Sequence, residues 1–160
     1  MRFKELADRK VEITEADLEA IVAEELGTGA VHRYSIVSLD FHGGTQHQPT
    51  AQIVLADVES GTKVDATGAG NGMIDAAFDA IASATGVTGT VVDFKVAAVT
   101  GGGDALGDTV IQLESDGRRA TGRGVSTDVV EASARAYLNA VNKLVRLRDR
   151  NERRERTVGP

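Results

Sequence analysis

The chain has 160 residues, enough for one domain with a buried core, and its apolar and charged fractions are ordinary for a globular protein. It has no cysteine, which excludes disulfides and thiolate chemistry, and its net charge of −6 argues against general nucleic-acid binding. No apolar run approaches the roughly 20 residues that span a membrane, and the charged N-terminus does not resemble a signal peptide. We therefore expect a cytoplasmic protein that binds neither membrane nor nucleic acid.

Residues 1–30 are predicted to form a connector that contains one short helix. Thr14 followed by Asp17 resembles a capping box, and Gly27 ends the apolar pattern, so a helix is expected over residues 14–26. Its apolar face is narrow and must dock elsewhere in this chain or on another chain. That face consists of Leu18, Ile21, Val22 and Leu26.

Three strands and a helix are predicted between Tyr34 and Gly86. Apolar and polar residues alternate at 37–41, 51–55 and 62–67, which is the period of a β-strand. The Ser60-Gly61 pair predicts a tight turn, so the second and third strands should form an antiparallel hairpin. The helix follows at once and ends near Gly86, with Ile74, Ala77, Phe78 and Ile81 on its apolar face.

The same order of elements is predicted again in the second half of the chain. Strands are expected at 92–98, 109–113 and 118–121, with a turn at Asp116-Gly117. A long helix follows, and Ser126 or Thr127 is its expected N-cap. Its apolar stripe is Val130, Ala134, Tyr137, Val141 and Leu144.

The two halves can be aligned as a repeat. The Thr67-Gly68 pair matches Thr121-Gly122 at an offset of 54, whereas Asp75-Ala76 matches Glu131-Ala132 at an offset of 56, so the second turn is expected to be two residues longer. We therefore predict an α+β fold of two βββα units, at about 34–86 and 90–148, with antiparallel sheets packed against helices.

A glycine turn joins the third strand to the first of these helices. Gly68, Gly70 and Gly72 allow a sharp turn and leave backbone amides bare at the helix start. Those amides, together with the helix dipole, suit a carboxylate or a phosphate. The turn alone is a weak signal, because many such turns bind nothing.

Two other candidates have simpler interpretations. His42 and His47 lie in a polar stretch without a metal-ligand pattern, so we interpret them as surface residues and expect no metal. The basic stretch at 143–156 is interleaved with acids and has no aromatic residue, which favours a solvated helix end over a nucleic-acid site. Residues 151–160 are expected to be a disordered tail.

Four spaced strings resemble the C-terminal regulatory (LeuA allosteric) domain of 2-isopropylmalate synthase and of its relative citramalate synthase. They extend from about residue 34 to residue 146 in the family's order. The strings are Gly70-Asn-Gly72 with Ile74-Asp-Ala76; Ala98-Val-Thr-Gly-Gly-Gly-Asp-Ala105; Gly122-x-Gly124-x-Ser126-x-Asp128-x-x-Glu131-Ala-Ser133; and Tyr137-x-x-Ala-x-Asn142-Lys-Leu144.

The resemblance implies a function in feedback regulation. In that family two βββα units form the domain over residues corresponding to 31–150, the domain forms a homodimer, and an end-product amino acid binds between the units. The effector would be leucine, or isoleucine for a citramalate synthase, with no other cofactor in this chain. The implied effector site comprises Gly70, Asn71, Gly72, Ile74, Asp75 and Ala76, an opposite wall of Val91, Phe94 and Ala98, and the loop residues Asp104, Ala105 and Gly107. We expect this pocket to be enclosed, with a buried acid such as Asp75 or Asp104 pairing the ammonium group of the effector.

Two departures from the family pattern leave alternatives open. Met73 stands where the family usually has proline, which pre-sets the first helical turn, so a dimerisation module without effector binding is one alternative. The family's catalytic barrel carries a His-x-His metal pair that does not occur here, so we expect no catalysis by this chain alone. A barrel would act in cis or in trans, and the chain is either an excised domain or a free-standing regulator.

Overall fold

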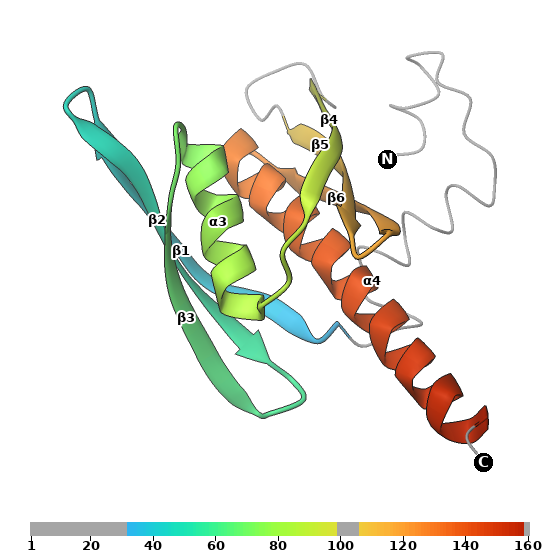
Figure 1. Ribbon diagram of the computed structural model, residues 1–160. Helices are drawn as coiled ribbons and strands as arrows, with labels where there is room; N and C mark the ends of the chain where they lie inside the picture. Colours follow the sequence, from blue (N-terminus) through green and yellow to red (C-terminus); the bar gives the residue numbers. More distant parts are fainter. Residues whose placement is uncertain (1–31, 99–105, 159–160) are drawn as a thin grey trace.

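The computed structural model describes residues 32–98 and 106–158, and the predicted helix at 14–26 lies outside them. Two units of three strands and one helix follow each other along the chain, which confirms the predicted α+β fold (Figure 1). Unit one comprises β1 (Tyr34–Gly44), β2 (His47–Asp57), β3 (Thr62–Ala69) and α3 (Met73–Thr85). Unit two comprises β4 (Thr90–Ala98), β5 (Gly107–Ser115), β6 (Arg118–Ser126) and α4 (Val129–Val158).

Each unit is an antiparallel meander, with sheet orders β1-β2-β3 and β4-β5-β6. The edge strands β1 and β4 carry a bulge at the same place, where Val37 and Val92 are the extra residues. The β5–β6 connection is the predicted two-residue turn, in which Asp116 and Gly117 both have positive φ, of 52° and 75°. The bulge shared by β1 and β4 supports the internal repeat.

The repeat aligns differently from the sequence prediction. Gly68 of β3 lies against Ala76 and Ala80 of α3, and Gly124 of β6 lies against Ala132 and Ala136 of α4. The offset from β3 to β6 is therefore 56, the same as the offset between the helices, and the predicted two-residue insertion in the second turn is wrong. The sequence match at Gly122 was misleading because that glycine meets Ala136 and Ala140, one helical turn further along α4.

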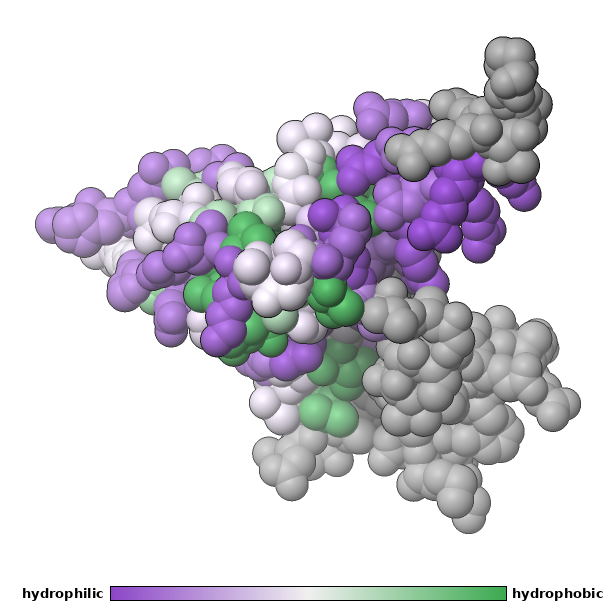
Figure 2. Space-filling model, turned by 90° about the horizontal axis from the view of Figure 1, so that it is seen from below, coloured by the Kyte–Doolittle hydropathy of each residue, from purple (hydrophilic) through white to green (hydrophobic). Residues whose placement is uncertain are grey.

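The core lies between each sheet and its helix, and the two helices also contact each other. Ile53 and Leu55 of β2 are fully buried, as are the equivalent Ile111 and Leu113 of β5. Figure 2 shows hydrophobic residues gathered in the middle of the lower face, between the hydrophilic end of the β1–β2 hairpin and the hydrophilic C-terminal part of α4. No helix of the described residues is both long and apolar enough to span a membrane.

An aromatic cluster joins the two units. The ring of Phe78 on α3 stacks on Tyr137 of α4, with centroids 4.5 Å apart, and meets Phe94 of β4 in a tilted arrangement at 6.2 Å. Such pairs contribute about 0.5–1.5 kcal/mol beyond the area that they bury. Phe94 therefore belongs to the packing between units, as its partial burial also indicates.

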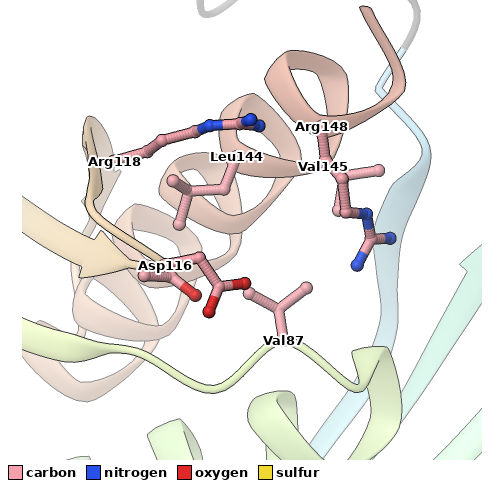
Figure 3. Close-up of a pocket in the computed structure, with 7 residues that line it drawn as sticks. Val87, Asp116, Arg118, Leu144, Val145 and Arg148 are labelled. Atoms are coloured by element: carbon pink, nitrogen blue, oxygen red, sulfur yellow. The ribbon is translucent and has the colours of Figure 1, made fainter. Parts of the chain in front are cut away.

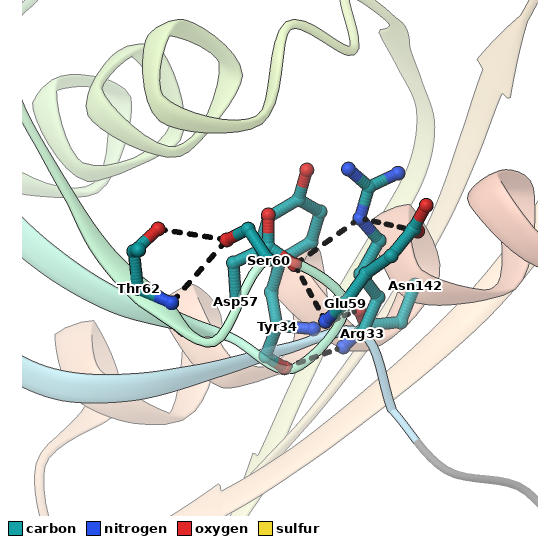
Figure 4. A network of polar contacts seen from close by, with 7 residues as sticks. All are labelled: Arg33, Tyr34, Asp57, Glu59, Ser60, Thr62 and Asn142. Atoms are coloured by element: carbon teal, nitrogen blue, oxygen red, sulfur yellow. Dashed lines mark hydrogen bonds and ion pairs between the residues drawn. The ribbon is translucent and has the colours of Figure 1, made fainter.

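A buried side chain on α4 makes a second link between the units. The side-chain oxygen of Asn142 accepts a hydrogen bond from the backbone N–H of Tyr34 at 3.0 Å, and its amide group donates to the carbonyl oxygen of Tyr34 at 2.9 Å (Figure 4). Asn142 therefore pairs with the start of β1 in the way that a neighbouring strand would. Arg33 beside it contacts Asp57 and Glu59, and its guanidinium lies over the ring of Tyr34.

The second helix differs from its prediction at both ends. Asp128 caps α4, because its carboxylate accepts from the N–H of Val130 at 2.8 Å, so the predicted cap at Ser126 or Thr127 is wrong. Ser126 instead accepts from the N–H of Asp128 and donates to Glu131. At the other end, α4 continues to Val158 through the region predicted to be a disordered tail, where charges of opposite sign four residues apart favour helix.

Candidate effector site

The residues of the expected effector site lie on three elements near one end of the molecule. The start of α3, the end of β4 and the start of α4 all lie at the upper end in Figure 1. Gly70 to Ala76 form the turn and first helical residues of unit one, and Val91, Phe94 and Ala98 lie on β4. Gly107 opens β5 and pairs with Ala98, whereas Asp104 and Ala105 lie outside the described residues.

The start of α3 has no side-chain cap. Gly72 is the N-cap residue in an extended conformation, and its carbonyl oxygen accepts from the N–H of Ala76 at 3.0 Å. An α-helix leaves its first four N–H groups without partners inside the helix. Asp75 lies in this first turn but is exposed, so the expectation that it is a buried acid is wrong.

The corresponding start of α4 is capped within the chain. Asp128 occupies the position equivalent to Gly72, since its carbonyl oxygen accepts from the N–H of Ala132. Its carboxylate accepts from the N–H of Val130, the residue equivalent to Ile74. The hydrogen bonds from Arg135 and Ser126 lower the pKa of the neighbouring Glu131 against the effect of burial, so this end of α4 holds fixed negative charge.

The turn before α3 is held by the hairpin beside it and by a side chain of α3 itself. The N–H of Gly70 donates to the carbonyl oxygen of Pro49 at 3.2 Å, and the carboxylate of Asp79 accepts from the N–H of Ala69 at 3.0 Å. The terminal methyl of Met73 lies 3.2 Å from where a Cβ on Gly43 would stand. Met73 therefore packs at the end of the β1–β2 hairpin, which accounts for a long side chain at the first helical position.

Two polar side chains in this part of the molecule were not among the expected site residues. Thr109 of β5 is fully buried, and its hydroxyl has no hydrogen-bond partner among the described residues. It lies between Val96 of β4 and Gly124 of β6, on the face of β5 that carries Ile111. The sequence signal for Thr109 was its place in the alternating pattern of the strand, where a polar residue occupies a position that faces the core. Burial, and then the charge of Asp79, raise the pKa of the Tyr137 hydroxyl, which therefore stays protonated at neutral pH.

Three hollows lined by described residues lie away from this site, around the β5–β6 turn and the second half of α4. The enclosed pocket at the start of α3 stays a prediction, because part of its expected wall lies at 99–105.

His42 and His47 lie at the end of the β1–β2 hairpin, opposite Thr50 and Gly44. No group of three metal-binding side chains occurs within residues 32–98 and 106–158.

Comparison with known proteins identifies the family. Residues 12–145 match the model of the LeuA allosteric (dimerisation) domain. The chain belongs to this domain family. It is 52% identical to 2-isopropylmalate synthase of Acidimicrobium ferrooxidans over 155 residues, 46% identical to that of Pelotomaculum thermopropionicum over 145 residues, and 42% identical to that of Pyrococcus furiosus over 145 residues.

These matches cover different shares of the two partners. They include 96%, 90% and 91% of this chain but 30%, 28% and 28% of the three relatives. The chain therefore corresponds to less than a third of the length of the synthases that it resembles. The resemblance stated from the sequence is confirmed at the level of the LeuA domain, and the role of each site residue stays a prediction.

Proposed function

We propose that this LeuA domain is a homodimeric amino-acid sensor of a 2-isopropylmalate synthase, and that it binds leucine at the start of α3. The observation that carries the proposal is the difference between the two helix starts. In unit two the carboxylate of Asp128 accepts from the N–H of Val130, whereas Gly72 offers no side chain at the equivalent position. The α-carboxylate of leucine would take the place at α3 that Asp128 fills at α4.

The surroundings suit the remaining parts of an aliphatic amino acid. Val91 and Phe94 are partly buried apolar residues on β4, and Phe94 reaches α3 through Phe78, one turn after Ile74. The buried hydroxyl of Thr109 is a hydrogen-bonding group in apolar surroundings. Asp75 is the acid in the first turn of α3, and it would meet the ammonium group from an exposed position.

We propose leucine as the effector rather than isoleucine because the similar proteins named above are all 2-isopropylmalate synthases. Calorimetric titration of the chain with leucine, isoleucine and valine tests this choice. We expect leucine to bind most tightly and to raise the melting temperature. If none of the three produced heat or a thermal shift at millimolar concentration, effector binding would be rejected and the domain would be a dimerisation module.

The family description also supports a homodimer. Light scattering at micromolar concentration should give twice the mass of the chain, and a monomer would contradict the proposal. We further propose that the chain has no synthase activity by itself. Incubation with acetyl-CoA and a branched 2-oxo acid should therefore give no condensation product, whereas turnover would show that catalysis resides here.

A further inference from the structure

A small cavity lies at the opposite end of unit two from the proposed leucine site. It has a volume of about 110 Å³ and is bounded by the β5–β6 turn, the second half of α4 and the segment that joins the two units (Figure 3). Val87 from that segment lies two residues beyond the end of α3. Because α3 has 13 residues, its start and this cavity are separated by roughly 20 Å of helix.

The floor of the cavity is apolar. Val87, Leu144 and Val145 are 7%, 5% and 2% exposed, so their side chains meet little water. They come from the joining segment and from α4, which places the floor at the junction of the two units. A branched aliphatic group in contact with them would be largely removed from water.

Three charged side chains surround this floor. Figure 3 shows the carboxylate of Asp116 directed towards Val87, the guanidinium group of Arg118 on the other side of Leu144, and that of Arg148 on the side of Val145. None of the three takes part in an ion pair within the described part of the chain. Asp116 is the first residue of the two-residue turn, with φ of 52°, and Arg118 follows directly after that turn at the start of β6.

We propose that this cavity binds a small aliphatic α-amino acid as its zwitterion, at a site separate from the start of α3. The arginine side chains bind the carboxylate through their N–H groups, and Asp116 accepts hydrogen bonds from the ammonium group. The aliphatic side chain packs on Val87, Leu144 and Val145. Two cations and one acid around an apolar floor match this ligand better than a simple anion, which Asp116 would repel.

Occupation of this site would connect the segment between the units to unit two. Val87 belongs to the connection between α3 and β4, whereas the charged groups belong to the β5–β6 turn and to α4. A ligand that contacts all three stabilises the arrangement in which both units pack together. The proposal does not depend on leucine binding at α3, because the two sites share no residue.

Titration with L-valine, followed by the methyl NMR signals of Val87, Leu144 and Val145, tests the site. We expect these signals to shift with saturation, and isovalerate and isobutylamine, which each lack one charged group, to bind at least tenfold more weakly. The titration is run in the Gly72→Asp variant, in which the start of α3 carries its own carboxylate. Binding that disappeared in this variant would belong to the α3 site and would overturn the proposal while leaving the leucine site intact.

A pair of matched double variants provides the control. Arg118→Gln with Arg148→Gln should weaken L-valine binding at least tenfold. Arg119→Gln with Arg146→Gln removes the same charge from neighbouring positions that line the adjacent groove, and should leave binding within twofold. Equal affinity in the two double variants, or isovalerate binding as tightly as L-valine, would overturn the proposal.

Discussion

Gly72 and Asp128 occupy the same position in the two repeats, and only Asp128 brings a carboxylate to the helix start. The carbonyl oxygens of both residues accept from the N–H four residues later, at Ala76 and Ala132. Asp128 also accepts from the N–H of Val130, and no side chain caps α3. In the proposed function, the carboxylate of the effector would take the place at α3 that the Asp128 carboxylate takes at α4.

This relationship predicts that Gly72→Asp both stabilises the chain and prevents leucine binding. A side chain fits at Gly72, where the space around a Cβ is open and the backbone is extended with φ of −146°. The new carboxylate would cap the helix and place a negative charge at the positive end of its dipole, which should add roughly 0.5–1 kcal/mol to the free energy of unfolding. Thermal unfolding and calorimetric titration with leucine measure the two effects.

Gly72→Ala is the matched control, because it adds a Cβ without a carboxylate. It should change the free energy of unfolding by only about 0.5 kcal/mol and keep leucine binding within a few-fold. If Gly72→Asp bound leucine as tightly as the unaltered chain, the effector carboxylate would lie elsewhere.

Replacement of Asn142 by Ala should weaken the attachment of β1 to α4. Asn142 is 2% exposed, and its removal leaves the N–H and carbonyl groups of Tyr34 without their partners. Unpaired buried polar groups cost about 1–3 kcal/mol each, so the loss of unfolding free energy should be roughly 2–4 kcal/mol in denaturant titration.

Asn139→Ala removes the same side chain one turn earlier on α4. Asn139 donates a hydrogen bond to the carbonyl oxygen of Arg123 within unit two, at a partly buried position. Its replacement should cost about 1 kcal/mol. Equal losses in the two variants would show that Asn142 does not have a special role between the units.

The sequence predicted the strand–strand–strand–helix order because periodicity and turn residues are local signals. The Asp116-Gly117 turn and the end of α3 at Gly86 follow from the backbone preferences of glycine, which need no tertiary information. The repeat offset was mispredicted because two glycines of β6 face α4. Gly122 and Gly124 meet successive turns of that helix, so either of them could be aligned with Gly68. Only the contacts of Gly68 and Gly124 with their alanines distinguish the two alignments.

The contacts between the units could not be predicted from periodicity. Asn142 meets Tyr34 across 108 positions of the chain, and nothing local to either residue indicates the other. Phe78 and Tyr137 were assigned to the apolar faces of separate helices, and their stacking depends on how these helices pack. The exposure of Asp75 follows from the same packing, because it places Ala76 and Ala77 on the buried side of α3.

Gly122→Ala should destabilise unit two severely. A Cβ at this position would stand 2.0 Å from the carbonyl oxygen of Ala136 and 2.4 Å from the backbone nitrogen of Ala140, so β6 would have to move away from α4. Overpacking against backbone that cannot yield should cost about 3 kcal/mol or more in unfolding free energy. Gly44→Ala, where no atom lies within 4 Å of the new Cβ, should cost less than about 0.5 kcal/mol. Similar losses in both variants would contradict the close contact of β6 with α4.

The acid sensitivity of unit one should depend on Asp57. Burial raises the pKa of its carboxyl, but the hydrogen bond from the Arg33 side chain, the N–H of Glu59 and the positive charge of Arg33 together lower that pKa below its ordinary value of 3.8. A group whose pKa is lower in the folded state stabilises the fold above its unfolded pKa, and this stabilisation is lost as the pH falls through the folded value. Asp57→Asn should therefore reduce the unfolding free energy at pH 7, and its difference from the unaltered chain should shrink below about pH 4.

Denaturant titrations between pH 2.5 and 7 measure this difference, and Arg33→Gln supplies the control. Without the guanidinium, which lies 3.4 Å from the Asp57 carboxylate and 3.3 Å from that of Glu59, the pKa of Asp57 should rise towards its ordinary value. The effect of Asp57→Asn on the unfolding free energy should then vary less with pH in the Arg33→Gln background. A pH dependence of the same size in both backgrounds would mean that the backbone N–H groups around Asp57, rather than Arg33, hold its carboxylate in the charged form.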